Sequence, residues 1–155
     1  TAVGKLAEKD ADYSAVTAAK NAVPSYLGVY TDESVARLNL AINSVEEGLK
    51  TDEQALVNDY AAAIVAQTKA LEYKPLNTAA YDTQVARIPA DIENYTADSV
   101  KAVTDAKAAV DTFLAGDVNI THQAQFNTLV DALKTAIDNL EKEVVAFLNT
   151  HDGVI

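Results

Sequence analysis

The side chains of this sequence that could do chemistry are chiefly hydroxyl groups in a motif that occurs twice. Each copy has a tyrosine, a threonine directly after it and a serine three residues further on: Tyr30, Thr31 and Ser34 in the first copy, and Tyr95, Thr96 and Ser99 in the second. A hydroxyl becomes a nucleophile when an adjacent base takes its proton. The two histidines, His122 and His151, have no partner at catalytic or metal-ligand spacing, so we expect surface positions for both and no catalytic triad.

One short segment has the alternate-residue spacing with which calcium loops begin. It comprises Asp117, Asn119 and Thr121. A calcium loop also needs a glycine at its sixth position and a bidentate glutamate at its twelfth, where this chain has His122 and Thr128. Cysteine is absent, which excludes disulfides and thiolate metal chemistry. We therefore expect no metal, no cofactor and no enzymatic activity.

The overall composition indicates a helical protein with an acidic surface. Hydrophobic residues make up 49% of the 155 residues but aromatic residues only 6%, a balance that suits thin helical bundles. Strands are not expected, because turn residues are scarce and no run alternates β-branched with polar residues. The net charge of −11 repels phosphate, so nucleic acid and anionic membranes are poor partners. No apolar run approaches the roughly 18 residues that a membrane span needs.

The two hydroxyl motifs belong to a longer internal repeat. Aligning Leu6 with Leu71 gives an offset of 65 residues, which continues without a gap to Val35 and Val100. A longer connector in the second copy then raises the offset to 69 residues. A repeat of this length corresponds to one small folded bundle per copy.

The repeat also predicts where the domains begin and end. The first residues resemble the close of a repeat's last helix, so we expect the chain to continue a longer array. The expected division is the end of a preceding repeat at 1–9, repeat one at 10–73, a linker at 74–77, repeat two at 78–148 and a tail at 149–155.

Apolar residues at three- and four-residue intervals predict three helices of about 18 residues in each repeat. The first helix should stop near Pro24 or Pro89, because proline removes a backbone donor. The apolar seam of the second helix in repeat one is Val35, Leu38, Ile42, Val45 and Leu49. We predict the class all-α, with two tandem up-down-up three-helix bundles in an elongated arrangement.

The hydroxyl motif has a structural interpretation at the start of the second helix. Thr31 and Thr96 are predicted N-caps. The neighbouring acids Asp32 and Glu33, which could suggest paired carboxylates for hydrolysis, point away from each other on a helix and complement its dipole.

The third helix has predicted caps of its own. Thr51 and Gln54 have the spacing of a capping box, and Thr121 is the predicted cap in the second copy.

Tyrosines near the connectors allow two interpretations. A tyrosine ring can stack on a sugar, which would make Tyr26, Tyr30, Tyr73 and Tyr95 a glycan-binding set. Alternatively, the tyrosines before the caps close the end of each bundle, as a staple residue does. Their recurrence at the same place in both copies favours the structural interpretation.

The pattern resembles the FIVAR domain of secreted and cell-wall-attached proteins of Gram-positive bacteria. The resemblance is carried by the repeated Tyr-Thr-x-x-Ser motif, by Ala41-Ile42 in the second helix and by the closing Ala136-Ile137-x-x-Leu140. It covers nearly the whole chain. It implies a non-catalytic extracellular module, commonly in tandem, that acts as a spacer or an attachment region.

We therefore expect a structural or spacer module of a surface-attached bacterial protein, located outside the cell. Its expected partners are neighbouring repeats or domains of the same chain. The alternative is a binding module for a host matrix protein or a glycan.

Overall fold

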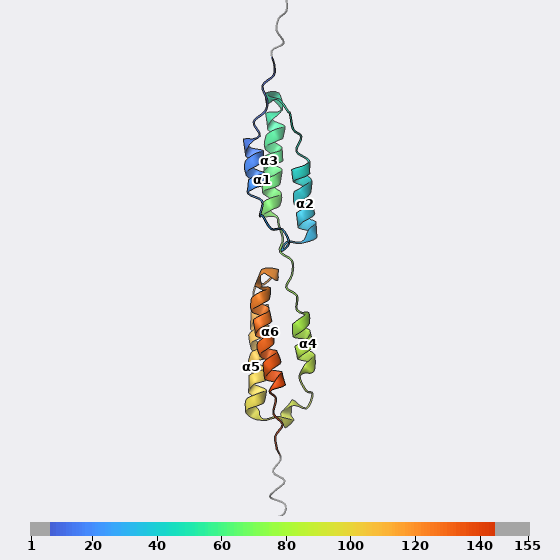
Figure 1. Ribbon diagram of the computed structural model, residues 1–155, viewed down its shortest axis with the longest axis vertical. Helices are drawn as coiled ribbons and strands as arrows, with labels where there is room; N and C mark the ends of the chain where they lie inside the picture. The colour runs from blue at the N-terminus through green and yellow to red at the C-terminus, as the bar shows by residue number, and fades with distance from the viewer. Residues whose placement is uncertain (1–6, 145–155) are drawn as a thin grey trace, which may run out of the picture. The chain divides into compact units, whose positions relative to one another are not determined.

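The computed structural model describes residues 7–144, and every regular element in this range is helical. Six α-helices and three short 3₁₀ helices follow one another along the chain (Figure 1). The only strand-like features among these residues are isolated bridges between single residues. The all-α class predicted from composition is therefore confirmed.

The chain divides into two compact units between Lys74 and Pro75. The first unit contains α1 (Ser14–Asn21), α2 (Asp32–Asn43), η1 (Thr51–Glu53) and α3 (Gln54–Lys69). The second contains α4 (Ala79–Arg87), η2 (Ile92–Asn94), α5 (Ala97–Leu114), η3 (Ile120–His122) and α6 (Gln123–Asp138).

In the first unit α3 packs against both α1 and α2 (Figure 1). Its buried face presents Val57 and Ile64, which meet Leu38 of α2 and Val16 of α1 in one apolar cluster. Three of these side chains, those of Leu38, Val57 and Ile64, are completely buried. Burial of each such side chain stabilises the fold by about 1.5–3 kcal/mol, and α3 contributes two of the three.

The second unit has the same plan, with α6 packed against α4 and α5, but its core includes aromatic rings. Phe126 is completely buried, 6.1 Å from the ring of Phe113 and 6.4 Å from the ring of Tyr81. By the repeat offsets, Phe126 corresponds to Val57 and Tyr81 to Val16. The second unit therefore buries larger side chains at equivalent positions.

The helices are less uniform in length than the apolar pattern predicts. Helix α5 has 18 residues, and α3 and α6 have 16 each. In contrast, α1 has 8, α4 has 9 and α2 has 12. The predicted length of about 18 residues is therefore wrong for α1, α2 and α4.

The largest departure is the end of α2, which stops at Asn43 although the predicted seam runs to Leu49. Gly48 then adopts a positive φ of 79°, a conformation that costs glycine least. The hydroxyl of Tyr13 donates to the backbone oxygen of Glu46 at 2.5 Å and accepts from the backbone N–H of Leu49 at 3.2 Å. Because the Tyr13 hydroxyl supplies hydrogen-bond partners for Glu46 and Leu49, the non-helical segment after α2 can still pack on the core.

Candidate functional site

The recurring hydroxyl motif lies at the start of α2 and of α5. In the first unit Thr31 is the N-cap, and its side-chain oxygen accepts from the backbone N–H of Ser34 at 3.3 Å. The same Thr31 hydroxyl donates to the Ser34 oxygen at 3.0 Å, and the Ser34 hydroxyl donates to the Thr31 carbonyl at 3.0 Å. Ser34 is 1% exposed and also accepts from the backbone N–H of Glu72 at 3.2 Å. Both hydroxyl groups are therefore fully occupied by the fold.

The second copy repeats this arrangement with one difference. Thr96 donates to Ser99 at 2.9 Å, Ser99 donates to the Thr96 carbonyl at 3.0 Å, and the backbone N–H of Glu141 donates to Ser99 at 3.2 Å. Thr96 occupies the N-cap position, but its side chain accepts no bond from the helix start. The predicted capping hydrogen bond forms in α2 and not in α5.

The motif joins the start of the second helix to the segment that leaves the third. The backbone N–H of Thr31 donates to the Glu72 oxygen at 2.7 Å, and that of Lys74 donates to the Val29 oxygen at 2.8 Å. In the second unit the equivalent bonds are Thr96 to Glu141 at 2.7 Å and Glu143 to Asn94 at 2.9 Å. This end of each unit is held by short antiparallel pairing that the sequence did not reveal.

The tyrosines of the motif have different neighbours in the two units. Tyr30 stacks on Tyr73 with ring centroids 4.8 Å apart and an angle of 21° between the rings. The neighbouring Tyr73 hydroxyl, together with partial desolvation, raises the pKa of Tyr30. At the position of Tyr73 the second unit has Lys142, whose ammonium lies 5.5 Å from the ring centroid of Tyr95. A stacked aromatic pair in one unit is thus replaced by a cation–π contact in the other.

A glutamine at the start of each third helix fixes the opposite end of its unit. The Gln54 side-chain oxygen accepts from the backbone N–H of Asp12 at 2.6 Å, and its amide donates to the Asp12 carbonyl at 2.9 Å. Gln123 makes the same two bonds to Asn77, at 2.8 Å and 3.0 Å. Sequence reasoning missed this role, although the recurrence of Gln-x-x-x-Asn at Gln54 and Gln123 was a visible signal.

The predicted capping box of Thr51 with Gln54 is accordingly wrong. The neighbouring Glu53 carboxylate accepts from the backbone N–H of Lys50 at 3.2 Å, one residue earlier than predicted. Because the Glu53 carboxylate accepts the hydrogen bond from the Lys50 N–H, the Gln54 side chain can hydrogen-bond to Asp12 instead.

In the first unit the incoming chain makes further bonds beside this glutamine. The backbone N–H of Ala11 donates to Leu49 at 3.0 Å, and that of Thr51 donates to Lys9 at 2.9 Å. The Lys50 ammonium lies 2.5 Å from the Asp10 carboxylate, and this contact lowers the pKa of Asp10. The incoming segment is therefore attached directly to the start of α3.

The segment with the spacing of a calcium loop is a helix cap. The Asn119 side-chain oxygen accepts from the backbone N–H of Thr121 at 3.0 Å and from its hydroxyl at 2.7 Å. The predicted cap at Thr121 therefore lies two residues too late. Among residues 7–144 no group of three potential metal ligands occurs.

His122 is half-buried, which differs from the predicted surface position. Its Nδ1 accepts from the backbone N–H of Asn119 at 3.2 Å, and its ring contacts Phe113 edge to face at 6.4 Å. His151 lies outside the described residues.

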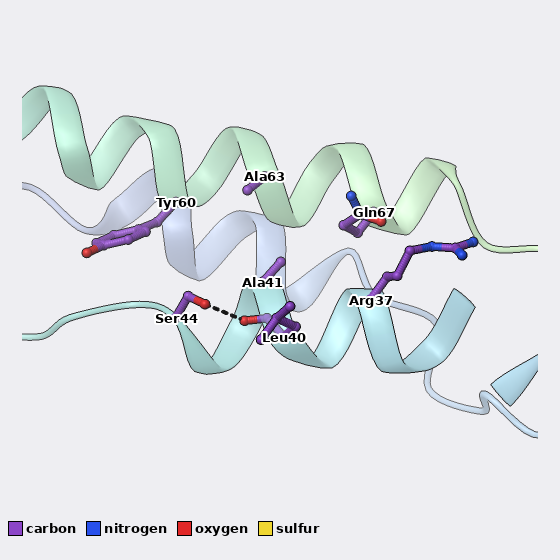
Figure 2. Close-up of a pocket in the computed structure, with 7 residues that line it drawn as sticks. All are labelled: Arg37, Leu40, Ala41, Ser44, Tyr60, Ala63 and Gln67. Atoms are coloured by element: carbon purple, nitrogen blue, oxygen red, sulfur yellow. Dashed lines mark hydrogen bonds between the residues drawn. The ribbon is translucent and has the colours of Figure 1, made fainter. Parts of the chain in front are cut away.

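A shallow groove of about 390 Å³ runs between α2 and α3 in the first unit (Figure 2). Leu40 and Ala41 line it from α2, and Tyr60 and Ala63 line it from α3, while Arg37 stands at one end. Leu40 is 69% exposed. In Figure 2 the Ser44 hydroxyl is turned to the Leu40 carbonyl, to which it donates at 2.7 Å, and Gln67 adds a polar side chain from α3.

These features define a class of protein: a helical repeat module whose recurring polar side chains stabilise each of the two ends of a unit. No protein-family model, curated protein or solved structure matches this chain. Within the described residues no helix is both long enough and apolar enough to span a membrane.

Proposed function

We propose that this chain is a non-catalytic spacer built of two tandem up-down-up three-helix bundles. One observation carries the proposal: in the first unit the chain arrives at one end of α3 and leaves at the other. Lys9 is hydrogen-bonded to Thr51 of η1, just before α3, and Glu72 is hydrogen-bonded to Thr31 just beyond the end of α3. Each passage through a unit therefore advances the chain by about the length of a 16-residue helix, roughly 24 Å.

The hydrogen bonds of the arriving segment suit such a role. A force applied to the chain at Lys9 is shared with Ala11 and Asp12, because all three residues are hydrogen-bonded to the chain around the start of α3. The force then passes along α3 to Glu72 and bypasses α1 and α2. The second unit retains the glutamine part of this attachment, through Gln123.

The non-catalytic part of the proposal is supported by the state of the hydroxyl groups. Ser34 and Ser99 each accept one backbone hydrogen bond and donate another. Among residues 7–144, neither serine is hydrogen-bonded to a histidine or a carboxylate that could take its proton.

The location and partners of the spacer are proposed from the resemblance to FIVAR domains. On that basis the module lies outside a Gram-positive cell, attached to its surface, and its partners are neighbouring repeats or domains of the same chain. The absence of cysteine and the net charge of −11 are compatible with this environment.

Small-angle X-ray scattering tests the spacer role. The experiment compares the 155-residue chain with a head-to-tail fusion of two copies. A spacer predicts a maximum dimension that nearly doubles in the fusion. A radius of gyration that follows the compact-globule relation for both proteins, with units packed side by side, would rule out the proposal.

A further inference from the structure

The first unit exposes two aromatic rings at the end where α3 leaves the core. Tyr73 is 48% exposed and Tyr26 is 69% exposed, and both lie on the two connectors joined by the Val29–Lys74 hydrogen bond. Among the described residues of this unit, the other large exposed hydrophobic side chains are aliphatic and belong to α2 and α3: Leu40, Leu56 and Val65. The large exposed hydrophobic side chains of these two connectors are therefore both aromatic.

Each ring is supported on one side and open on the other. Tyr73 rests against the half-buried Tyr30, with the ring centroids 4.8 Å apart. The ring of Tyr26 lies over Gly28, where any Cβ would collide with it. A supported ring with a free face is preorganised for stacking, because little side-chain freedom remains to be lost on binding.

The second unit lacks this surface at the equivalent positions. Asp91 stands in the place of Tyr26, Glu93 in the place of Gly28 and Lys142 in the place of Tyr73. The Lys142 ammonium lies 3.9 Å from the Asp91 carboxylate and over the Tyr95 ring. Because the described part of the second unit folds on the same plan with Asp91 and Lys142 at these positions, the fold itself does not require Tyr26 and Tyr73 to be aromatic.

The surroundings of the rings indicate the chemistry of a ligand. Charged groups flank Tyr73, since Glu72 lies 3.0 Å from Arg37 and Lys74 lies 3.4 Å from Asp32. A pyranose offers a C–H face for an aromatic ring and a rim of hydroxyls for such groups. The net charge of −11 repels polyanions, which favours an uncharged sugar.

We propose that Tyr26 and Tyr73 form a stacking site on the first unit for neutral pyranose glycans. The site is independent of the spacer role, because it involves exposed ring faces and not the hydrogen bonds that attach the arriving and leaving segments to the unit. The second unit is a natural control within the same chain.

An NMR titration of the 155-residue chain tests the site. The probes are three neutral hexasaccharides, cellohexaose, laminarihexaose and mannohexaose, with a hyaluronan hexasaccharide as the charged comparison. At least one neutral probe should shift the backbone amides of residues 26–31 and 72–74. It should leave residues 91–96 and 141–143 unshifted.

Variants that carry the residues of the second unit sharpen the test. Tyr26→Asp and Tyr73→Lys should each weaken binding about tenfold, the change expected when one ring face is lost. Tyr26 is so exposed that its replacement should leave the thermal midpoint unchanged, which separates lost binding from lost folding. The proposal is overturned if no neutral probe shifts the 26–31 and 72–74 amides, if both units respond alike, if Tyr26→Asp binds as the parent chain does, or if only hyaluronan binds.

Discussion

The side-chain oxygen of Ser34 accepts a hydrogen bond from the backbone N–H of Glu72 at 3.2 Å, across 38 residues of sequence. The same serine is 1% exposed and donates to the Thr31 carbonyl. One buried hydroxyl thus connects the first turn of α2 to the chain that has just left α3. The recurring serine is explained by this connection, and not by a reaction.

Replacing Ser34 with alanine should destabilise the first unit by about 1–3 kcal/mol, because a buried backbone N–H at Glu72 loses its acceptor. Urea unfolding measures the loss. Ser44→Ala is the matched control: this serine is exposed and its hydroxyl donates to the Leu40 carbonyl within its own helix, so a change within about 0.5 kcal/mol is expected. Equal effects of the two substitutions would contradict the connecting role of Ser34.

Replacing Gln54 with alanine should release the arriving segment from α3. Two hydrogen bonds to Asp12 are lost, so the expected cost is about 1–3 kcal/mol, and amide exchange at Asp12 should accelerate. Gln54→Glu keeps an acceptor for the Asp12 N–H but cannot donate to its carbonyl, and it should retain part of the protection. Unchanged exchange at Asp12 in the alanine variant would show that the neighbouring backbone bonds suffice.

The Phe126 ring is the largest completely buried side chain among the described residues. Phe126→Ala should cost the second unit about 3–5 kcal/mol, because the cavity it leaves lies between Tyr81 and Phe113. Val57→Ala at the equivalent position of the first unit removes fewer atoms and should cost less. Hydrogen exchange resolved by residue assigns each loss to its unit, and a larger effect of Val57→Ala would contradict the account of the two cores.

The apolar pattern was sufficient to predict the helical class and part of the cores, because burial of one helix face depends on the spacing of its apolar residues. In the predicted seam of the second helix, Leu38 is completely buried, whereas Val35 and Ile42 are only half-buried. The pattern could not predict that α2 stops at Asn43. The extended segment beyond it depends on the Tyr13 hydroxyl, which belongs to another part of the chain and is invisible to local periodicity.

The candidate site was predictable only in part for the same reason. The Thr31 cap is a local interaction and was found from its own sequence. The bonds of Gln54 to Asp12 and the stacking of Tyr30 on Tyr73 each join residues more than 40 positions apart, so their partners emerge only when the chain is folded. Tyr73 and Lys142 likewise occupy equivalent places in the two units, because each forms the bridge to the tyrosine of its motif. The contact that each makes there depends on the folded chain.

Acid should destabilise the second unit through Asp138, which binds both Arg87 and Lys134. The Arg87 guanidinium, and to a lesser degree the Lys134 ammonium, lower the pKa of Asp138 below its ordinary value of 3.8. A carboxylate whose pKa is lower in the folded state contributes stability above its unfolded pKa. That contribution is lost as the pH falls below 3.8 and through the folded pKa, because the unfolded chain then binds the proton more readily. Asp138→Asn should therefore lower stability at pH 7 and flatten the acid limb of a profile of unfolding free energy against pH.

The matched control is Asp105→Asn, since Asp105 pairs only with Lys101 one turn away on an exposed surface of the described chain. Exposed pairs of this kind contribute about 0.3–0.5 kcal/mol, so the acid limb should keep its slope. Urea midpoints at several pH values between about 2 and 7 provide the profile, and about 1 M salt should weaken the Asp138 effect by screening. If Asp138→Asn and Asp105→Asn give the same acid limb, the bridge from α4 to α6 does not set the acid stability of the unit.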